Sequence, residues 1–217
     1  MTVRRLADEN IQPDHFSFTK DNENWAKLLI KRYPMGRQQS AVIPLLMRAQ
    51  EQEGWVTRAA IEYVANLLSM AYIRVLEIAT FYTQFHLHPV GKLAHIQVCG
   101  TTPCMLRGAE ELIKICKRRI NNNPLETTSD GKLSWEEVEC QGACVNAPMV
   151  MIFKDTYEDL TPETFEKIID MFEAGEGDKI TPGSQISRRS SEPISGLTSL
   201  VGDPSNLAVV KSNKDKK

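Results

Sequence analysis

Cys99-Gly100-Thr101-Thr102-Pro103-Cys104 is the first of two cysteine pairs in this sequence, and Cys140-Gln141-Gly142-Ala143-Cys144 is the second. Each pair comes at the end of an alternating apolar pattern, over residues 93–99 and 133–140, that predicts a strand. Loops that follow neighbouring strands can meet at one edge of a sheet. The two pairs therefore predict both an α/β fold and the position of its site.

Four converging thiolates are the ligand set of a tetrahedral zinc ion or of an iron–sulfur cluster. Zinc-binding turns most often place two residues between paired cysteines, whereas these pairs enclose four and three residues. The wider gaps favour a [2Fe–2S] cluster in which each pair holds one iron. Zinc remains an alternative at this point, as do disulfides or inert thiols.

The residues around the first pair also suit an anionic centre. Thr101 or Thr102 is expected to cap a helix that has Pro103 in its first turn. Cys104 would then lie at a helix N-terminus, where free N–H groups and the helix dipole favour negative charge. In the second loop, Gly142 leaves room for the backbone to approach closely.

The remaining chemically active side chains have simpler explanations. Cys116 lies on the apolar stripe of a helix predicted over residues 103–120 and is expected to be a buried, inert thiol. His86, His88 and His95 lie at a helix end and within a strand, so we do not expect them to bind metal. The sequence has no Gly-x-Gly-x-x-Gly motif, Walker-type loop or Cys-x-x-Cys pair, so it predicts neither a dinucleotide site nor a thiol–disulfide exchange site.

The composition is that of a folded protein without special affinity for nucleic acid. The 217 residues are 41% hydrophobic and 25% charged, and 26 basic against 28 acidic residues give a formal net charge of −2. This near balance argues against a binder of duplex nucleic acid. No apolar run approaches the roughly 18 residues of a membrane span. Residues 1–10 lack the features of a secretory signal or a transit peptide, so a protein of the cytosolic type is expected.

The periodicity of apolar residues divides the chain into three parts. Residues 1–88 are predicted to form a helical bundle, in which Ser40 and Thr57 cap helices and Gly54 ends one. Its four helices are expected near residues 21–33, 40–53, 57–68 and 73–85. Residues 89–174 are predicted to form a domain with the order strand, helix, three strands, helix, the last helix starting at Thr161-Pro162. Residues 175–217 lack aromatic residues and are rich in serine and glycine, which predicts an extended, flexible tail.

The two cysteine loops resemble those of a known family. Residues 98–107 and 138–149 are similar to the two cluster-binding loops of the 24 kDa [2Fe–2S] subunit of respiratory complex I, the E-subunit family of NADH:quinone oxidoreductases. Residues 33–46 and 79–82 resemble the helical half of that family, and residues 192–200 resemble its tail. The resemblance covers residues 12–203.

The resemblance implies a thioredoxin-like [2Fe–2S] ferredoxin domain preceded by a helical bundle. It implies one [2Fe–2S] cluster, because Cys99, Cys104, Cys140 and Cys144 match the four ligands of the family position by position. It also implies an electron-transfer subunit of an oxidoreductase, with FMN and NADH bound by a partner subunit and no NADH-binding active site in this chain. The expected place is the peripheral arm of complex I, without membrane insertion, on the cytoplasmic side of a bacterial inner membrane or the matrix side of a mitochondrial one.

Three other functions fit parts of this pattern. The same motifs occur in the iron–sulfur subunit of NAD-linked hydrogenases and formate dehydrogenases. A zinc-stabilised interaction module would use the same thiols without redox chemistry. A thiol–disulfide oxidoreductase would need a shorter cysteine spacing than either pair offers. The aliphatic residues of the tail predict in addition that residues 185–210 become ordered against the flavin-bearing partner.

Overall fold

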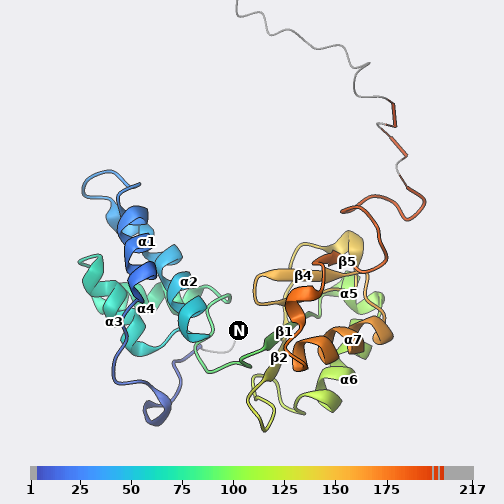
Figure 1. The fold of residues 1–217 in the computed structure, drawn as a ribbon, viewed down its shortest axis with the longest axis horizontal. Coiled ribbons are helices and arrows are strands. Elements are labelled where there is room, and N and C mark those ends of the chain that lie inside the picture. Colours follow the sequence, from blue (N-terminus) through green and yellow to red (C-terminus); the bar gives the residue numbers. More distant parts are fainter. Residues whose placement is uncertain (1–3, 197, 200, 203–217) are drawn as a thin grey trace, which may run out of the picture.

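A computed structural model of the chain describes residues 4–196, 198–199 and 201–202, which form two lobes with separate hydrophobic cores (Figure 1). The first lobe contains helices α1 (Lys20–Ile30), α2 (Val42–Glu53), α3 (Arg58–Leu67) and α4 (Tyr72–Phe81). The second contains β1 (Ala94–Cys99), α5 (Thr102–Leu106), α6 (Ala109–Arg119), β2 (Leu133–Val138), β3 (Val150–Ile152), β4 (Asp155–Glu158), α7 (Pro162–Glu173) and β5 (Gly183–Ser184). None of the helices in the described part of the chain combines the length and the apolar character that crossing a membrane requires.

The helical lobe confirms the predicted order of four helices. The Thr57 hydroxyl accepts a backbone hydrogen bond at 3.0 Å and caps α3, as predicted. Gly54 ends α2 with a φ of +83°, a conformation that costs glycine no steric strain. The predicted Ser40 cap is wrong, because Ser40 lies in a 3₁₀ turn, Gln38–Ala41, and α2 begins directly after that turn without a side-chain cap.

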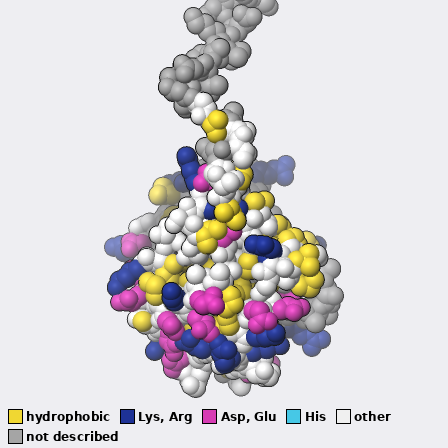
Figure 2. All heavy atoms as spheres, turned by 90° about the vertical axis from the view of Figure 1, so that its right-hand side faces the viewer, with side chains coloured by type: hydrophobic (Ala, Val, Ile, Leu, Met, Phe, Trp, Pro, Cys, Tyr) yellow, Lys and Arg dark blue, Asp and Glu magenta, His cyan; other side chains and the backbone are white. Residues whose placement is uncertain are grey.

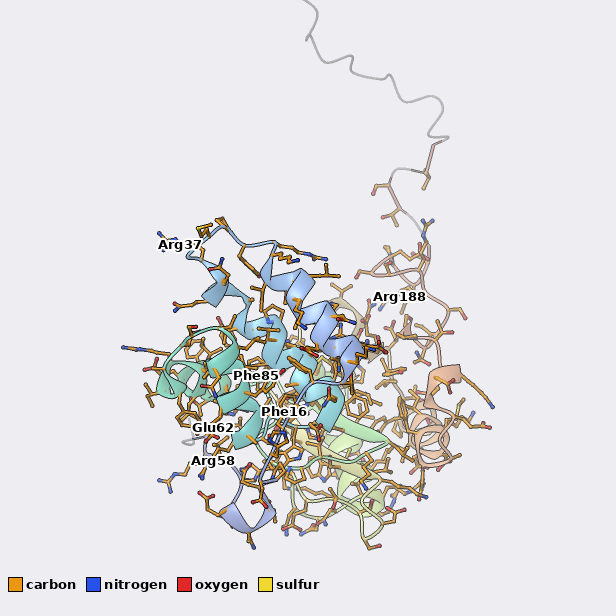
Figure 3. All side chains as sticks on the ribbon, turned by 60° about the vertical axis from the view of Figure 1, so that its left-hand side comes forward. Phe16, Arg37, Arg58, Glu62, Phe85 and Arg188 are labelled. Atoms are coloured by element: carbon orange, nitrogen blue, oxygen red, sulfur yellow. The ribbon has the colours of Figure 1, made fainter. Side chains whose placement is uncertain are left out.

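The core of this lobe comes from the helix faces that the periodicity marks. Leu46, Ile61 and Val64 are fully buried. Phe16, from the segment before α1, and Phe85, from the segment after α4, also lie inside the lobe (Figure 3). Each such side chain contributes about 1.5–3 kcal/mol through burial, so packing rather than helix propensity stabilises the bundle.

The fourth helix is shorter than predicted, because α4 ends at Phe81 instead of continuing to Phe85. The guanidinium of Arg4 donates hydrogen bonds to the carbonyl oxygens of Thr80 at 3.3 Å and Tyr82 at 2.7 Å. It also donates to the carbonyl of Phe85. Arg4 thus satisfies main-chain carbonyl groups at the end of α4 and in the segment that follows it. The spacing of apolar residues could not predict this contact between residues 78 positions apart.

The second lobe is built on a five-stranded sheet with the strand order β2-β1-β3-β4-β5. β1 is parallel to β2 and antiparallel to β3, β3 is antiparallel to β4, and β4 is parallel to β5. Apolar residues of one face, such as Ile96 and Trp135, share a core with Leu112 of α6 and Phe165 of α7. The predicted order of strand, helix, three strands and helix is confirmed, and β5 is an addition to it.

The helix predicted over residues 103–120 is two helices. α5 ends at Leu106 and α6 begins at Ala109, after Gly108 with a φ of +106°. The break keeps α5 with the first cysteine loop while α6 packs on the sheet. α7 follows the prediction, since Thr161 caps it and Thr164 completes a capping box.

The first part of the predicted tail lies on the second lobe. β5 adds a strand to the edge of the sheet beside β4. Arg188 forms an ion pair with Asp159 in which both side chains are 8% exposed. Folded contacts thus continue past the predicted tail boundary at Gly175, because backbone pairing and one buried ion pair hold a segment of polar composition. Residues 197, 200 and 203–210 of the predicted docking arm lie outside the described residues.

The two lobes meet at a polar cluster formed by His86, His95 and Glu136. The imidazole rings of His86 and His95 are in edge-to-face contact with centroids 4.5 Å apart. In the same cluster, the His95 Nδ1 atom lies 2.8 Å from the Ser134 hydroxyl, and its Nε2 atom lies 3.2 Å from the Glu136 carboxylate. Burial, with a smaller contribution from His95, lowers the pKa of His86 to about 3. His86 is therefore neutral in the folded chain near pH 7.

Gly91, in the linker between the lobes, is predicted to tolerate no side chain. A Cβ atom there would lie 2.3 Å from the Ala94 carbonyl oxygen and 2.5 Å from the Leu133 carbonyl carbon, both backbone atoms. We expect Gly91→Ala to lower the free energy of unfolding by about 1–3 kcal/mol, the usual cost of overpacking, in urea denaturation followed by tryptophan fluorescence. Gly202→Ala is the matched control, since open space surrounds its added Cβ, and should change stability by less than about 0.5 kcal/mol. Equal stability of the two variants would contradict the prediction.

The neutral state of His86 predicts a pH dependence of stability. In the unfolded chain His86 binds a proton as the pH falls below about 6.5, whereas in the folded chain its pKa is about 3. The stability that the neutral ring allows is thus complete above pH 6.5. It is lost by up to about 1.4 kcal/mol per pH unit as the pH falls. His86→Gln lacks this contribution, so its unfolding free energy should fall less steeply than that of the native chain between pH 6 and pH 4. Parallel curves for the two proteins would show that His86 is protonated when folded.

Candidate metal centre

The first cysteine loop runs from the end of β1 into α5. Cys99 is the last residue of β1, Cys104 lies in α5, and both side chains are buried. Thr101 is the N-cap residue of α5, as predicted, but its side chain makes no capping hydrogen bond. Instead, its hydroxyl lies 3.3 Å from the Cys99 Sγ atom. The Thr101 hydroxyl therefore forms a hydrogen bond with the cysteine instead of capping the helix.

The second cysteine loop follows β2 and is less buried. Cys140 is exposed, and Cys144 is partly exposed at the start of a 3₁₀ turn, Cys144–Asn146. The two Sγ atoms lie 3.3 Å apart, too far for a disulfide bond. Gly142 has a φ of +88°, and its N–H donates a hydrogen bond to the Cys140 Sγ atom at 3.4 Å. Only glycine adopts this conformation readily, so the predicted role of Gly142 in backbone approach is supported.

Strand pairing brings the two loops together. Because β1 and β2 are parallel with Cys99 opposite Val138, both loops leave the sheet at the same edge. The Gly100 N–H donates to the Val138 carbonyl at 3.0 Å and joins the first loop to the end of β2. The structure thus places both predicted cysteine pairs at the same edge of the sheet.

Hydrogen bonds make one thiol of each pair more acidic than its partner. Burial works to raise the pKa of Cys99, but hydrogen bonds from the Thr101 hydroxyl and N–H outweigh it and the pKa is lowered. The Gly142 N–H lowers the pKa of Cys140. Burial, and then the hydrogen bond with Cys99, raise the pKa of Cys104 to about 12. The pKa of Cys144 is raised mainly by its hydrogen bond with Cys140.

This pattern shows what kind of group the site can hold. Thiolates gathered at one edge of the sheet repel one another, and hydrogen bonds lower the pKa of only two of the four thiols. A cationic metal centre would make all four favourable, because metal ligation deprotonates a thiol. The donor set is therefore that of a metal centre bound by four sulfurs, and the residues fit either a zinc ion or an iron–sulfur cluster.

The site lies at a surface that also contains apolar side chains. Near the cysteines, Met105, Leu106 and Val145 are 43%, 76% and 67% exposed. Cys140 is exposed as well, whereas Cys99 and Cys104 are buried. One side of the centre is thus enclosed by the protein and the other side is open to solvent.

Cys116 takes no part in this group. It lies in α6 within the hydrophobic core, and burial raises the pKa of its thiol. It lies outside both cysteine loops. The prediction that Cys116 is a buried thiol is confirmed.

The lobe junction is a second place where metal-binding side chains gather. Ligand atoms of His86, His95 and Glu136 all lie within 4.8 Å of one another. Their hydrogen bonds are already complete at His95 and Glu136, because Ser134 and Gln97 supply the other partners. Sequence reasoning did not include Glu136. Only the register of β1 on β2, which pairs Gln97 with Glu136, shows that this carboxylate lies beside the two histidines, and the sequence does not reveal that register.

Comparison with known proteins separates the two kinds of metal centre. Residues 26–173 match the family of thioredoxin-like [2Fe-2S] ferredoxins. The chain is 70% identical over 200 residues to the E 1 subunit of the NADH-quinone oxidoreductase of Rhizobium meliloti (strain 1021), a match that covers 92% of this chain and 73% of that protein. It is 54% identical over 162 residues to the E subunit of the NADH-quinone oxidoreductase of Rickettsia bellii (strain RML369-C), a match that covers 74% of this chain and 96% of that one.

Solved structures support the same fold. The air-oxidized NAD+-reducing [NiFe]-hydrogenase superposes with a TM-score of 0.55 at 18% identity, over 64% of this chain and 24% of that chain. At this identity the likeness speaks for the fold alone, and this chain spans about a quarter of that one. The match to the family is much stronger evidence than this superposition, because it includes both cysteine loops and more than half of the sequence. One [2Fe–2S] cluster is accordingly the cofactor, and the chain belongs to the thioredoxin-like [2Fe–2S] ferredoxins.

Proposed function

We propose that this chain is the electron-transferring E subunit of an NADH:quinone oxidoreductase and that Cys99, Cys104, Cys140 and Cys144 hold its [2Fe–2S] cluster. The observation that carries the proposal is the convergence of these four thiols at one partly exposed edge of the sheet. The relatives at 70% and 54% identity are E subunits of NADH-quinone oxidoreductases, which supports this complex as the place of action.

The bound cluster supplies a site that accepts and releases one electron at a time. The residues of this chain hold it and set its surroundings. The Gly142 N–H donates a hydrogen bond to the Cys140 sulfur, and the Thr101 hydroxyl is placed to donate one to the Cys99 thiolate, which stabilises the charge of both. Burial of Cys99 and Cys104 excludes water from one side. Exposure of Cys140 on the other side shortens the path for an electron to or from a partner.

The partner in this proposal is the flavin-bearing, NADH-binding subunit. NADH delivers a hydride, which carries two electrons, whereas a [2Fe–2S] cluster takes one. The sequence has no glycine-rich loop for a dinucleotide, so the flavin of a partner must divide the pair. The exposed Met105, Leu106 and Val145 beside the cluster loops are the surface that we assign to this contact. The chain then belongs to the peripheral arm of complex I, on the cytoplasmic side of a bacterial membrane or the matrix side of a mitochondrial one.

An NAD-linked hydrogenase is the second candidate. The superposition on an NAD+-reducing hydrogenase favours it only at the level of the fold. The identity to the E subunits of quinone reductases is far higher, so the respiratory enzyme is the better assignment. Co-purification decides between them, since the respiratory assignment requires quinone-reductase subunits and the alternative requires hydrogenase subunits.

The ligand assignment predicts which cysteines are needed for the cluster. Serine at any one of Cys99, Cys104, Cys140 or Cys144 should lower the iron and sulfide content to less than about half, because removing one ligand costs at least tenfold in metal affinity. Cys116→Ser is the matched control and should keep the native content and the red-brown colour. Equal loss of iron in Cys116→Ser would exclude this ligand set.

The division of labour predicts an inactive isolated subunit. Purified, flavin-free chain with its cluster intact should not oxidise NADH above the rate of buffer alone, as measured by absorbance at 340 nm. Chemical reduction with dithionite should bleach the same sample, which shows that the cluster is able to accept an electron. Sustained NADH oxidation by the flavin-free chain would contradict the proposed role of the partner.

A further inference from the structure

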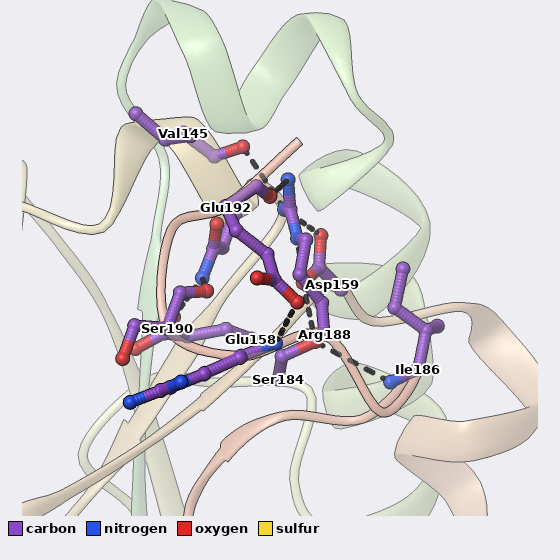
Figure 4. A network of polar contacts seen from close by, with 10 residues as sticks. Val145, Glu158, Asp159, Ser184, Ile186, Arg188, Ser190 and Glu192 are labelled. Atoms are coloured by element: carbon purple, nitrogen blue, oxygen red, sulfur yellow. Dashed lines mark hydrogen bonds and ion pairs between the residues drawn. The ribbon is translucent and has the colours of Figure 1, made fainter. Parts of the chain in front are cut away.

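Residues 183–192, here called the C-terminal strap, lie against the second cysteine loop (Figure 4). β5 begins the strap and pairs with β4, with Tyr157 opposite Gly183. The Gln185 N–H donates to the Glu158 carbonyl at 3.0 Å and continues this attachment. The strap therefore starts from a fixed edge of the sheet rather than from solvent.

Arg188 connects the strap to the residue that follows Cys144. Its guanidinium donates to both carboxylate oxygens of Asp159, at 2.5 Å and 3.2 Å, and both side chains are 8% exposed. The same guanidinium donates to the carbonyl of Val145 at 3.2 Å and to that of Glu192 at 3.1 Å (Figure 4). The planar arrangement of its donors lets one side chain hold three segments at once.

Asn146 makes a second connection between the loop and the strap. Its side-chain NH₂ donates to the Ser190 carbonyl at 2.9 Å and to the Glu158 carboxylate at 2.6 Å. The main-chain carbonyl of Asn146 accepts a hydrogen bond from the Asp159 N–H at 2.7 Å. Asn146 is 2% exposed, so these bonds form in a site that is shielded from water. The two residues after Cys144 are thus both bound by the strap.

The second cysteine loop depends on such contacts more than the first loop does. Cys99 ends a buried strand and Cys104 lies in a helix, so regular structure fixes both. Cys140 is exposed outside β2, and Cys144 begins a 3₁₀ turn of three residues. A short 3₁₀ turn has little stability of its own.

We propose that the C-terminal strap is a positioning device for the cluster site and that Arg188 is its positioning residue, which acts on Cys144 through Val145. The inference rests on the proposed ligand set. Its effect is geometric rather than electrostatic, because the charge of Arg188 is balanced by Asp159 in the same ion pair. Losing the strap contacts should let the turn at Cys144 open and release the cluster.

The test uses the full chain with its cluster, three variants of the strap and one control variant. Arg188→Ala removes all strap contacts of the guanidinium, and Arg188→Lys keeps the charge but not the bonds to both Asp159 and Val145. Arg188→Ala/Asp159→Asn also removes the unpaired carboxylate, so that the chain can fold, and asparagine suits the φ of +54° at that position. Arg119→Ala is the control, because Arg119 joins α6 to Asp170 and Glu173 of α7, away from the cysteine loops.

Two measurements are made. The first is the rate at which visible absorbance is lost in excess EDTA. We expect both variants with alanine at position 188 to lose the cluster about tenfold faster than the native chain. The rate of Arg188→Lys should lie between the native rate and the rate of the alanine variants, and the rate of Arg119→Ala should stay within twofold of the native rate. The second is amide hydrogen exchange of the metal-free chain. Exchange should increase in peptides that contain residues 143–148, and remain as in the native chain in peptides that contain residues 99–106.

Each result has one meaning. Native rates in both variants with alanine at position 188 would overturn the proposal, as would equal acceleration in Arg119→Ala or exchange that rises throughout the lobe. Full rescue by Arg188→Lys would overturn the geometric role in favour of charge. A native chain that binds no iron and sulfide would refute the ligand set instead, and the exchange measurement on the metal-free chain would still decide whether the strap holds the turn.

Discussion

The parallel pairing of β1 with β2 is the constraint on which the site depends. It places Cys99 opposite Val138, so that both cysteine loops begin at the same edge of the sheet. A shift of one residue would send the buried side chains of one strand to the wrong face. The core formed by Ile96 and Trp135 therefore fixes the register, and through the register it fixes the distance between the two cysteine pairs.

The other face of the same strands explains why the two lobes stay together. His95 and Gln97 alternate with apolar residues in β1, yet every residue of this strand is buried. Their polar atoms form hydrogen bonds with Ser134 and Glu136 on the neighbouring strand β2. Buried polar groups are costly without partners, and here the side chains of His95 and Gln97 have theirs within the sheet. The ring of His86 can therefore pack against His95 without leaving a polar group of β1 unpaired.

Local signals in the sequence were sufficient for much of the fold and for the placement of both cysteine pairs at one edge of the sheet. The caps at Thr57 and Thr161 and the stop at Gly54 follow from backbone chemistry within one turn, and they were predicted correctly. The break at Gly108 was missed because apolar periodicity continues across it. The contacts of Arg4 and Arg188 were missed for a different reason. Each joins segments distant in sequence, and no periodicity or spacing encodes which carbonyl a guanidinium will find.

The two halves of the site are built for different demands. A cluster needs a shielded environment, and the first loop provides it with a buried strand and a helix in the core. An electron carrier also needs an approach for its partner, and the second loop provides it by leaving Cys140 exposed. Exposure removes the packing that would otherwise hold the loop in place. On the face of this lobe shown in Figure 2, side chains of both charges are mixed. No patch of one charge on that face could therefore hold the second loop in place. Specific hydrogen bonds from Arg188 and to Ser190 take the place of packing, because they fix a turn without covering the surface beside it.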